Sequence, residues 1–189
     1  MLKDLITQNR TRRRFYQEEV VSMETLRDLI DMARLSMTGQ NKQGLRFYLS
    51  NTPEENAKVF STLGWAGALP EWPGPQEGER PSAYVVIAQD TEIKPGLHDT
   101  GIAANNILLG ATEKGLGGLM FGSVKFDELH QLLGMEEKHK IVLVVAIGKP
   151  KEIVVMDAMP ADGKWAYWRD ENQVHHVPKR TLDDLIISK

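Results

Sequence analysis

The chain of 189 residues contains no cysteine. This absence excludes disulfide bonds, thiolate catalysis and Cys-based zinc or iron–sulfur sites, so any redox chemistry would depend on a bound cofactor. No apolar run approaches the ~20 residues of a membrane span, and the first six residues lack the order of a secretion signal. We therefore expect a cytoplasmic protein with no membrane partner.

The chain also lacks an excess of positive charge. Its 23 Lys and Arg residues against 26 Asp and Glu residues give a formal net charge of −3, whereas a general polyanion binder carries the opposite sign. The hydrophobic fraction of 41% and the charged fraction of 26% are typical of a globular protein. We expect one domain over residues 1–189, with ample core and no nucleic-acid partner.

Positive charge is nevertheless concentrated in residues 9–16, here called the Arg stretch. Arg10, Arg12, Arg13 and Arg14 lie within this segment, where like charges repel one another unless an anion relieves them. Guanidinium groups match phosphate oxygens, and the hydroxyl of Thr11 adds another donor. A bound phosphate is the sharper interpretation. A solvated basic face or a loose nucleic-acid patch is the alternative that this segment leaves open.

Periodicity and capping signals predict helices that alternate with strands. The helices carry apolar residues at helical spacing, and Ser22 and Thr52 are the expected N-caps of two of them. The strand at residues 82–90 is nearly continuous in apolar character, as a strand buried on both faces should be. Helices are expected at residues 3–8, from residue 23, from 53 to about 63, at 99–114 and at 126–133, and Gly115 closes the fourth of them. Strands are expected at 46–50, 82–90, 119–121 and 141–148, and Lys149 and Pro150 stop the last strand.

Two loops have compositions that suit a binding site. Residues 36–44 contain small and amide-bearing side chains, and Asn41 and Gln43 can each donate and accept at the edge of a heteroaromatic ring. An ordinary polar turn is the alternative. Residues 64–81 are rich in proline and glycine, so they form a long loop. Its Trp65 and Trp72 either wall an active site or anchor the loop on the core.

The Arg stretch and residues 37–47 together resemble the nitroreductase family of FMN-dependent oxidoreductases. That family opens with Arg-Arg-Ser-x-Arg-x-Phe and later has Pro-Ser-x-x-Asn-x-Gln-Pro-x-x-Phe. The resemblance extends over nearly the whole chain. The matching positions are Arg13, Phe15, Asn41, Gln43 and Phe47, and the replacements are Asn9 for Arg, Thr11 for Ser, Met37 for Pro, Thr38 for Ser and Gly44 for Pro.

The resemblance implies an α+β fold, a nitroreductase-like three-layer sandwich with a mainly antiparallel sheet flanked by helices. It also implies an intertwined homodimer with FMN at each of two subunit interfaces and the helix at 99–114 in the middle of the interface. Residues 151–189 would form a C-terminal arm on the partner subunit, ending in a short helix at about 182–186. A doubly wound α/β fold is not excluded by element order, but no Gly-x-Gly-x-x-Gly follows a strand.

The resemblance also assigns roles to individual residues. Arg10, with Lys179 or Arg180, would hold the FMN phosphate, and Arg13 would lie near the pyrimidine edge, where positive charge stabilises the reduced flavin. A backbone amide at Gly122 or Ser123 would face flavin N5. Residues from the other subunit would complete the ring and ribityl contacts. The full set of predicted cofactor-binding residues is Arg10, Thr11, Arg12, Arg13, Met37, Thr38, Gly39, Asn41, Gly122, Ser123, Lys179 and Arg180.

The implied reaction passes hydride from NADH or NADPH through the flavin to a nitroaromatic, a quinone or a similar acceptor by a ping-pong mechanism. No side chain is required as nucleophile or general base, and catalysis is left to the cofactor. His175 and His176 would point to opposite faces of an extended segment without a third ligand, so no metal is expected. The rival functions are a flavin-binding or redox-sensing protein without efficient turnover and a small nucleic-acid protein.

Overall fold

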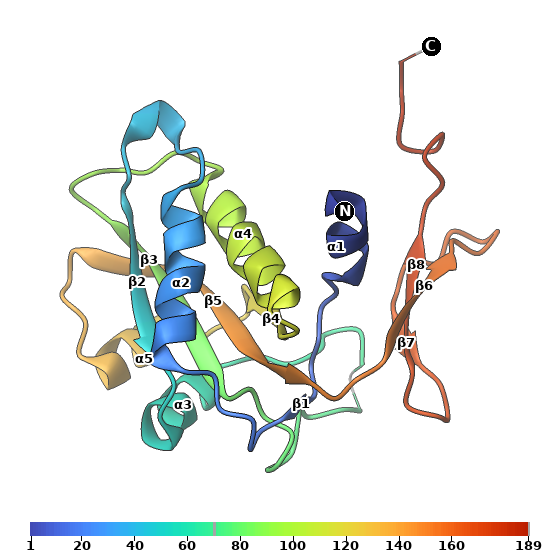
Figure 1. The fold of residues 1–189 in the computed structure, drawn as a ribbon, viewed down its shortest axis with the longest axis horizontal. Coiled ribbons are helices and arrows are strands. Elements are labelled where there is room, and N and C mark those ends of the chain that lie inside the picture. The colour runs from blue at the N-terminus through green and yellow to red at the C-terminus, as the bar shows by residue number, and fades with distance from the viewer. Residues whose placement is uncertain (70, 189) are drawn as a thin grey trace.

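The computed structural model describes residues 1–69 and 71–188 (Figure 1). Pro70, inside the predicted loop at 64–81, and Lys189, at the end of the predicted arm, lie outside the described residues. Within the described ranges, no helix has both the length and the apolar character needed to cross a membrane.

The central sheet is built around two long, buried strands. β3 (Ala83–Asp90) and β5 (His139–Pro150) pair with each other, β2 (Leu45–Ser50) pairs with the other edge of β3, and β4 (Gly117–Phe121) and β1 (Phe15–Tyr16) pair with β5. All of these pairings are antiparallel. β3 is buried on both faces, as its apolar run predicts.

Helices cover both faces of this sheet, and successive residues of β3 face alternate layers. α2 (Met23–Arg34) and α4 (Asp99–Glu113) pack on one face, and α3 (Pro53–Phe60) and α5 (Phe126–Leu133) on the other (Figure 1). The predicted α+β sandwich is therefore confirmed. One core holds Leu26, Leu29, Val85, Ile87 and Ile107, and the other holds Val59, Tyr84, Val86, Leu129 and Val144.

The predicted helix caps are present, with one wrong boundary. The hydroxyls of Ser22 and Thr52 accept from the amides three residues later, and Gly115 takes the left-handed conformation with φ 70°. α3 ends at Phe60, although the sequence places its end near Leu63. Leu63 instead forms a bridge with Val124, which draws it away from the helix.

The C-terminal arm, residues 151–188, folds as a second, smaller sheet. β6 (Val154–Ala158) runs parallel to β8 (His175–Lys179), and β7 (Trp168–Arg169) pairs antiparallel with β8. This sheet stands beside α1 (Leu2–Gln8), apart from the main layers (Figure 1).

Two predictions about this end of the chain are wrong. β5 does not stop before Lys149 and Pro150, because Phe15 and Tyr16 of β1 pair with these two residues and extend the strand. The short helix expected at 182–186 is a hydrogen-bonded turn, in which the Leu185 amide donates to the Leu182 carbonyl at 3.1 Å. Its apolar side chains are exposed, so no packing stabilises a helix there.

Candidate functional site

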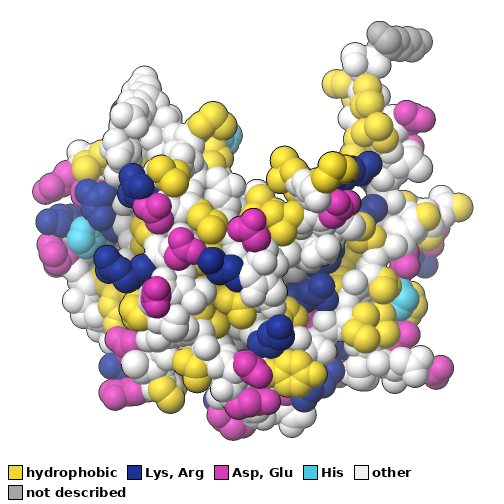
Figure 2. Space-filling view, in the orientation of Figure 1, with side chains coloured by type: hydrophobic (Ala, Val, Ile, Leu, Met, Phe, Trp, Pro, Cys, Tyr) yellow, Lys and Arg dark blue, Asp and Glu magenta, His cyan; other side chains and the backbone are white. Residues whose placement is uncertain are grey.

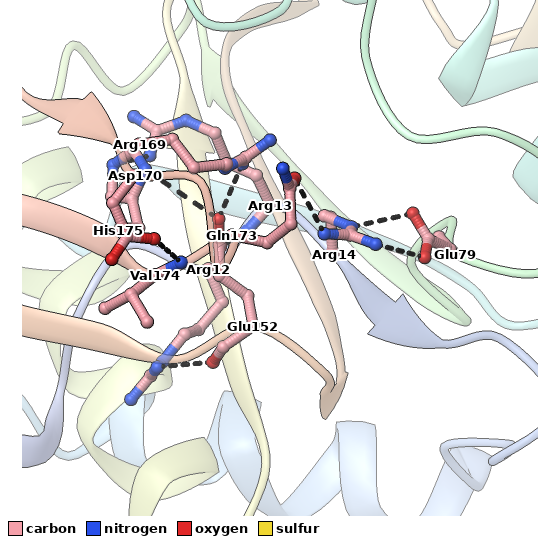
Figure 3. Close-up of polar contacts among 10 residues, drawn as sticks. All are labelled: Arg12, Arg13, Arg14, Glu79, Glu152, Arg169, Asp170, Gln173, Val174 and His175. Carbon is pink, nitrogen blue, oxygen red and sulfur yellow. Dashed lines mark hydrogen bonds and ion pairs between the residues drawn. The ribbon is translucent and has the colours of Figure 1, made fainter.

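The Arg stretch lies between the main sheet and the arm. The Arg12 amide donates to the Gly118 carbonyl at the start of β4 (2.9 Å), and the Arg13 amide donates to Glu152 Oε2 on the arm (2.7 Å). Both sides of the segment are therefore held by main-chain hydrogen bonds, which fix the directions in which its side chains leave the backbone (Figure 3).

Arg14 is used inside the protein. Its Nε and Nη2 atoms donate to the two carboxylate oxygens of Glu79 at 2.7 and 2.6 Å, a paired geometry that Figure 3 shows directed away from Arg12. Lys151 adds an ion pair with the same carboxylate at 3.0 Å. The hydrogen bond from Arg14 is the main cause that lowers the pKa of Glu79 to about 2. Arg14 therefore ties the loop at 64–81 to the Arg stretch.

Arg13 is buried beneath the arm. Its Nη1 atom lies 3.0 Å from Nε2 of His175, and its guanidinium carbon lies 4.3 Å from the centre of the Tyr167 ring. Because a guanidinium can only donate, Nε2 must accept and the imidazole is neutral. Burial, reinforced by the charges of Arg13 and Arg169, lowers the pKa of His175 to about 4.

Glu152 lies at the centre of this buried cluster. Its side chain is fully buried, Oε1 accepts from Arg169 Nη2 at 2.8 Å, and its main-chain carbonyl accepts from Arg12 Nη1 at 2.8 Å. Sequence reasoning missed Glu152, since an isolated acidic residue after a strand carries no local signal of burial. It also considered His175 only as a metal ligand.

Arg10 and Arg12 are partly exposed, unlike the buried Arg13. Arg10 donates from Nη2 to the Ile6 carbonyl at 2.7 Å and places Nη1 3.3 Å from the sulfur of Met156, while its Nε atom is buried without a protein partner. Met156 pairs with Val177 on β8, two residues before Lys179. The structure thus brings Arg10 against the arm sheet whose last strand ends at Lys179, with Arg180 next along the chain.

The residues predicted to contact the ring form a strained turn at the end of α2. A short 3₁₀ segment, Gly39–Asn41, follows Thr38, and Gln40 and Asn41 both have φ 55°. Left-handed conformations of non-glycine residues each cost on the order of 1 kcal/mol and persist where neighbouring groups hold them. Here the buried Asp99 holds the turn in this conformation.

Asp99, in the first turn of α4, anchors this turn through its two oxygens. Oδ1 accepts from the Gly39 amide at 2.8 Å, and Oδ2 accepts from the Gly96 amide at 2.8 Å. Asp99 was also missed as a site residue, because its sequence signal is that of an ordinary acidic residue opening a helix.

One chain does not bring the two halves of the predicted site together. The Arg stretch borders Gly118, just after the end of α4, whereas the Gly39–Asn41 turn is anchored at Asp99, where α4 begins. A helix of 15 residues separates its ends by about 22 Å. Two α4 helices packed antiparallel across a twofold axis would bring the Arg stretch of one chain near the turn of the other.

Gly122 and Ser123 follow the end of β4 at a partly open surface. Gly122 is exposed, and a Cβ atom built on it would meet nothing within 4 Å. The Ser123 carbonyl accepts from the Gly64 amide at 2.8 Å, which fixes the start of the loop at 64–81 beside it.

Trp65 anchors the loop at 64–81 on the core. Its ring meets Phe121 edge-on at 4.7 Å and Trp72 at 6.1 Å. The loop also reaches the arm, since the Ala68 amide donates to the Tyr167 hydroxyl at 3.3 Å and Arg169 lies over Trp72 at 4.8 Å. The loop therefore connects the end of β4 to the arm.

A large open hollow lies elsewhere on the described part of the chain. It measures about 960 Å³, is formed between α5 and β5, and is lined by none of the predicted site residues. Its open shape and its distance from the Arg stretch in the fold argue against it as the predicted site. No cluster of three or more possible metal ligands occurs within residues 1–69 and 71–188.

Comparisons with known proteins support one family. Residues 78–149 match the model of the nitroreductase family. An Archaeoglobus fulgidus protein with a provisional NADH dehydrogenase/NAD(P)H nitroreductase name is 27% identical over 148 residues, 74% of this chain and 80% of the relative. A Bacillus subtilis protein with a provisional NAD(P)H nitroreductase name is 26% identical over 80% of this chain and 86% of its own. The family model and both relatives support a likeness to the nitroreductase family.

Solved structures of the nitroreductase family share the fold. A family protein from Streptococcus pneumoniae superposes with a TM-score of 0.71 at 15% identity, covering 100% of both chains. A protein from Desulfovibrio desulfuricans, provisionally named a nitroreductase and solved in complex with FMN, gives a TM-score of 0.71 at 19% identity over 100% of this chain and 96% of its own. The comparisons support the predicted family, and the similar structures confirm its fold. The roles of single residues stay predictions.

Proposed function

We propose that this protein is an FMN-dependent oxidoreductase of the nitroreductase type. It would pass hydride from NADH or NADPH to a nitroaromatic, a quinone or a similar acceptor. The family match and the names of the relatives support an oxidoreductase, and the FMN complex of a similar structure supports this cofactor. The observation that carries the proposal is the placement of Arg10, with its buried and unpartnered Nε atom, against the arm strand that ends at Lys179.

The residues present fit the phosphate and ring of FMN. A buried guanidinium nitrogen without a protein acceptor suits an anionic oxygen, because an unsatisfied buried donor is costly. Arg10 and Arg12, with Lys179 or Arg180, would bind the phosphate. The strained turn at Thr38–Asn41 would hold the ring and the ribityl chain, and the open side of Gly122 would let the ring approach the backbone.

The positions of these residues support a homodimer. The Arg stretch and the Gly39–Asn41 turn lie at opposite ends of α4, so a complete site requires a second chain. Hydrophobic side chains are exposed on α1 and on the end of the arm, and Figure 2 shows hydrophobic surface on the projecting end of the arm. We propose that these surfaces, and the arm as a whole, pack on the partner subunit. The exposed residues are Met1, Leu2, Ile6, Leu182, Leu185, Ile186 and Ile187.

The chain's own residues would bind and orient, while bound FMN would supply the hydride-transfer chemistry. Arg13 would provide fixed positive charge near the pyrimidine edge, and its contact with His175 restricts its movement. The loop at 64–81, tied to Ser123 and Tyr167, would border the acceptor's side of the site and limit water access. No proton-transferring side chain is required.

The visible spectrum of the purified protein tests this proposal first. We expect a flavin spectrum, release of FMN on denaturation, bleaching by NADH or NADPH without oxygen, and recovery of colour on adding a nitroaromatic acceptor. A flavin that is bound but not reduced by either nucleotide would support the flavin-binding alternative. A colourless protein that takes up no FMN and is retained on DNA in a steeply salt-dependent way would favour the nucleic-acid alternative.

A further inference from the structure

The buried charge cluster between the arm and the Arg stretch has more positive than negative members. The Arg169 guanidinium donates to the Glu152 carboxylate, and the Arg12 guanidinium donates to the main-chain carbonyl of the same residue. The Arg13 guanidinium lies against the neutral His175, so three positive groups share one carboxylate. Such a cluster is costly to bury unless every group is paired in good geometry. The arrangement of this cluster therefore depends on the few contacts that Glu152 makes.

Glu152 joins the backbone of the Arg stretch to the arm. Through Oε2 it accepts from the Arg13 amide, through Oε1 from Arg169, and through its main-chain carbonyl from Arg12 Nη1. The opposite side of the stretch is held by Gly118, which accepts from the Arg12 amide. The stretch is thus clamped between β4 and one buried side chain of the arm.

We propose that Glu152 is a positioning residue of the phosphate site. Its carboxylate fixes the backbone at Arg12 and Arg13, and thereby the direction in which Arg10 and Arg12 present their charge. His175 supports it by holding the Arg13 side chain, with Nδ1 3.9 Å from Glu152 Oε1. This inference rests on the proposed function, since it assumes that the anion is the phosphate of FMN.

The test compares FMN with riboflavin, which has the same ring but no phosphate. Glu152→Gln keeps the shape, but its single accepting oxygen cannot serve both the Arg13 amide and Arg169, so the backbone of the Arg stretch is held less firmly. We expect the dissociation constant for FMN to rise at least tenfold while that for riboflavin changes less than twofold. Equal losses for both flavins, or no loss for either, would overturn the positioning role.

Glu79→Gln is the matched control. Glu79 also binds an arginine of the same stretch, but through the Arg14 side chain, which points toward the loop and away from the predicted phosphate site. The Glu79→Gln variant should have a lower melting temperature and an unchanged ratio of FMN to riboflavin affinity. A change of that ratio as large as the one in Glu152→Gln would also overturn the inference, because disturbance of any buried acid would then suffice.

If Glu152→Gln does not fold, two variants of His175 test the same inference. His175→Phe removes the acceptor for Arg13 but keeps a ring beside Tyr167, whereas His175→Gln keeps an acceptor. We expect His175→Phe to weaken both flavins through Arg13 at the ring. Because the backbone of the Arg stretch is loosened as well, the preference for FMN should also fall severalfold, and His175→Gln should restore most of it. Identical behaviour of the two variants would count against the inference. A wild-type protein that binds FMN and riboflavin equally would refute the phosphate site itself, and the proposed function with it.

Discussion

The two halves of the proposed flavin site are held in place by different means. The Arg stretch is fixed by a network of charges that reaches the arm through Glu152 and the loop at 64–81 through Glu79. The Gly39–Asn41 turn is fixed by one carboxylate, Asp99, and stores backbone strain in left-handed residues. One half should therefore select the charge of a ligand, and the other the shape of its ring.

This difference matters for ligand recognition because only one half contains charge that a ligand can neutralise. The arginines lose favourable interactions when the phosphate is removed, whereas the turn offers neutral amide donors and acceptors that bind FMN and riboflavin alike. Variants of the two halves should consequently be separable by comparing these two flavins. If the two halves formed one rigid unit, variants of either half would change the binding of FMN and riboflavin in the same way.

The largest effect is expected for Arg10→Ala. Loss of a charge-assisted hydrogen bond and of the nearby charge should cost about 2–3 kcal/mol of FMN binding, roughly a 100-fold rise in dissociation constant. Riboflavin affinity should stay within twofold, as measured by flavin fluorescence titration. The control is Arg27→Ala, which removes an exposed arginine of α2 and should alter neither affinity.

Asp99→Asn should affect the other half of the site. An Asn side chain has only one accepting oxygen for the Gly39 and Gly96 amides, so the turn loses one anchor at a cost of about 1–3 kcal/mol. We expect FMN and riboflavin to weaken by the same factor, roughly tenfold. Asp31→Asn, on the exposed side of α2, is the control; a loss confined to FMN would contradict the division of the site.

Acidification should loosen only the half that contains the arm. The pKa of His175 is lowered from 6.5 to about 4, so the unfolded chain binds more protons between these values and stability falls as the pH drops through this window. The total loss in the free energy of unfolding is on the order of 3 kcal/mol. The charged and titratable groups that face His175 are Arg12, Arg13, Glu152, Arg169 and His176, with Tyr167 against its ring.

Urea unfolding at several pH values measures this effect. His175→Phe, which cannot take up a proton, should flatten the dependence between pH 6.5 and 4, and His176→Phe should leave it in place. Glu79 contributes at lower pH, because its pKa is lowered to about 2 and its stabilisation fades only as the pH falls from about 4.5 toward that value. An unchanged slope in His175→Phe would show that another group is responsible.

The smallest effect is expected for Gly122→Ala. The added methyl group meets no protein atom within 4 Å, so the free energy of unfolding should change by less than about 0.5 kcal/mol. Affinity for both flavins should fall severalfold if the ring approaches this backbone. Gly67→Ala, at an equally open glycine of the loop, should change neither; unaltered flavin binding by Gly122→Ala would remove this residue from the site.

The sequence predicted those parts of the fold that local patterns determine. Ser22 and Thr52 cap helices, Gly115 is left-handed, and the apolar run of β3 is buried on both faces. These outcomes depend on neighbouring residues, whose chemistry can be read directly. The family motifs likewise located the Arg stretch and the turn at Thr38–Asn41.

The contacts that hold the site were not predictable in the same way. Glu152 meets Arg13 across 139 positions of the chain, and Asp99 meets Gly39 across 60, so neither burial nor partner shows in local spacing. The end of β5 at Pro150 and the parallel pairing of β6 with β8 depend equally on distant segments. The helix expected at 182–186 was wrong because its apolar face packs against nothing within the described chain.

The central claim is that the Arg stretch and the end of the arm bind the phosphate of a flavin. Titration of the wild-type apoprotein with FMN and riboflavin at two salt concentrations tests it most directly. The account predicts that FMN binds at least ~100-fold more tightly, and that higher salt reduces this preference by screening the charges. Equal affinity for the two flavins at low salt would contradict it.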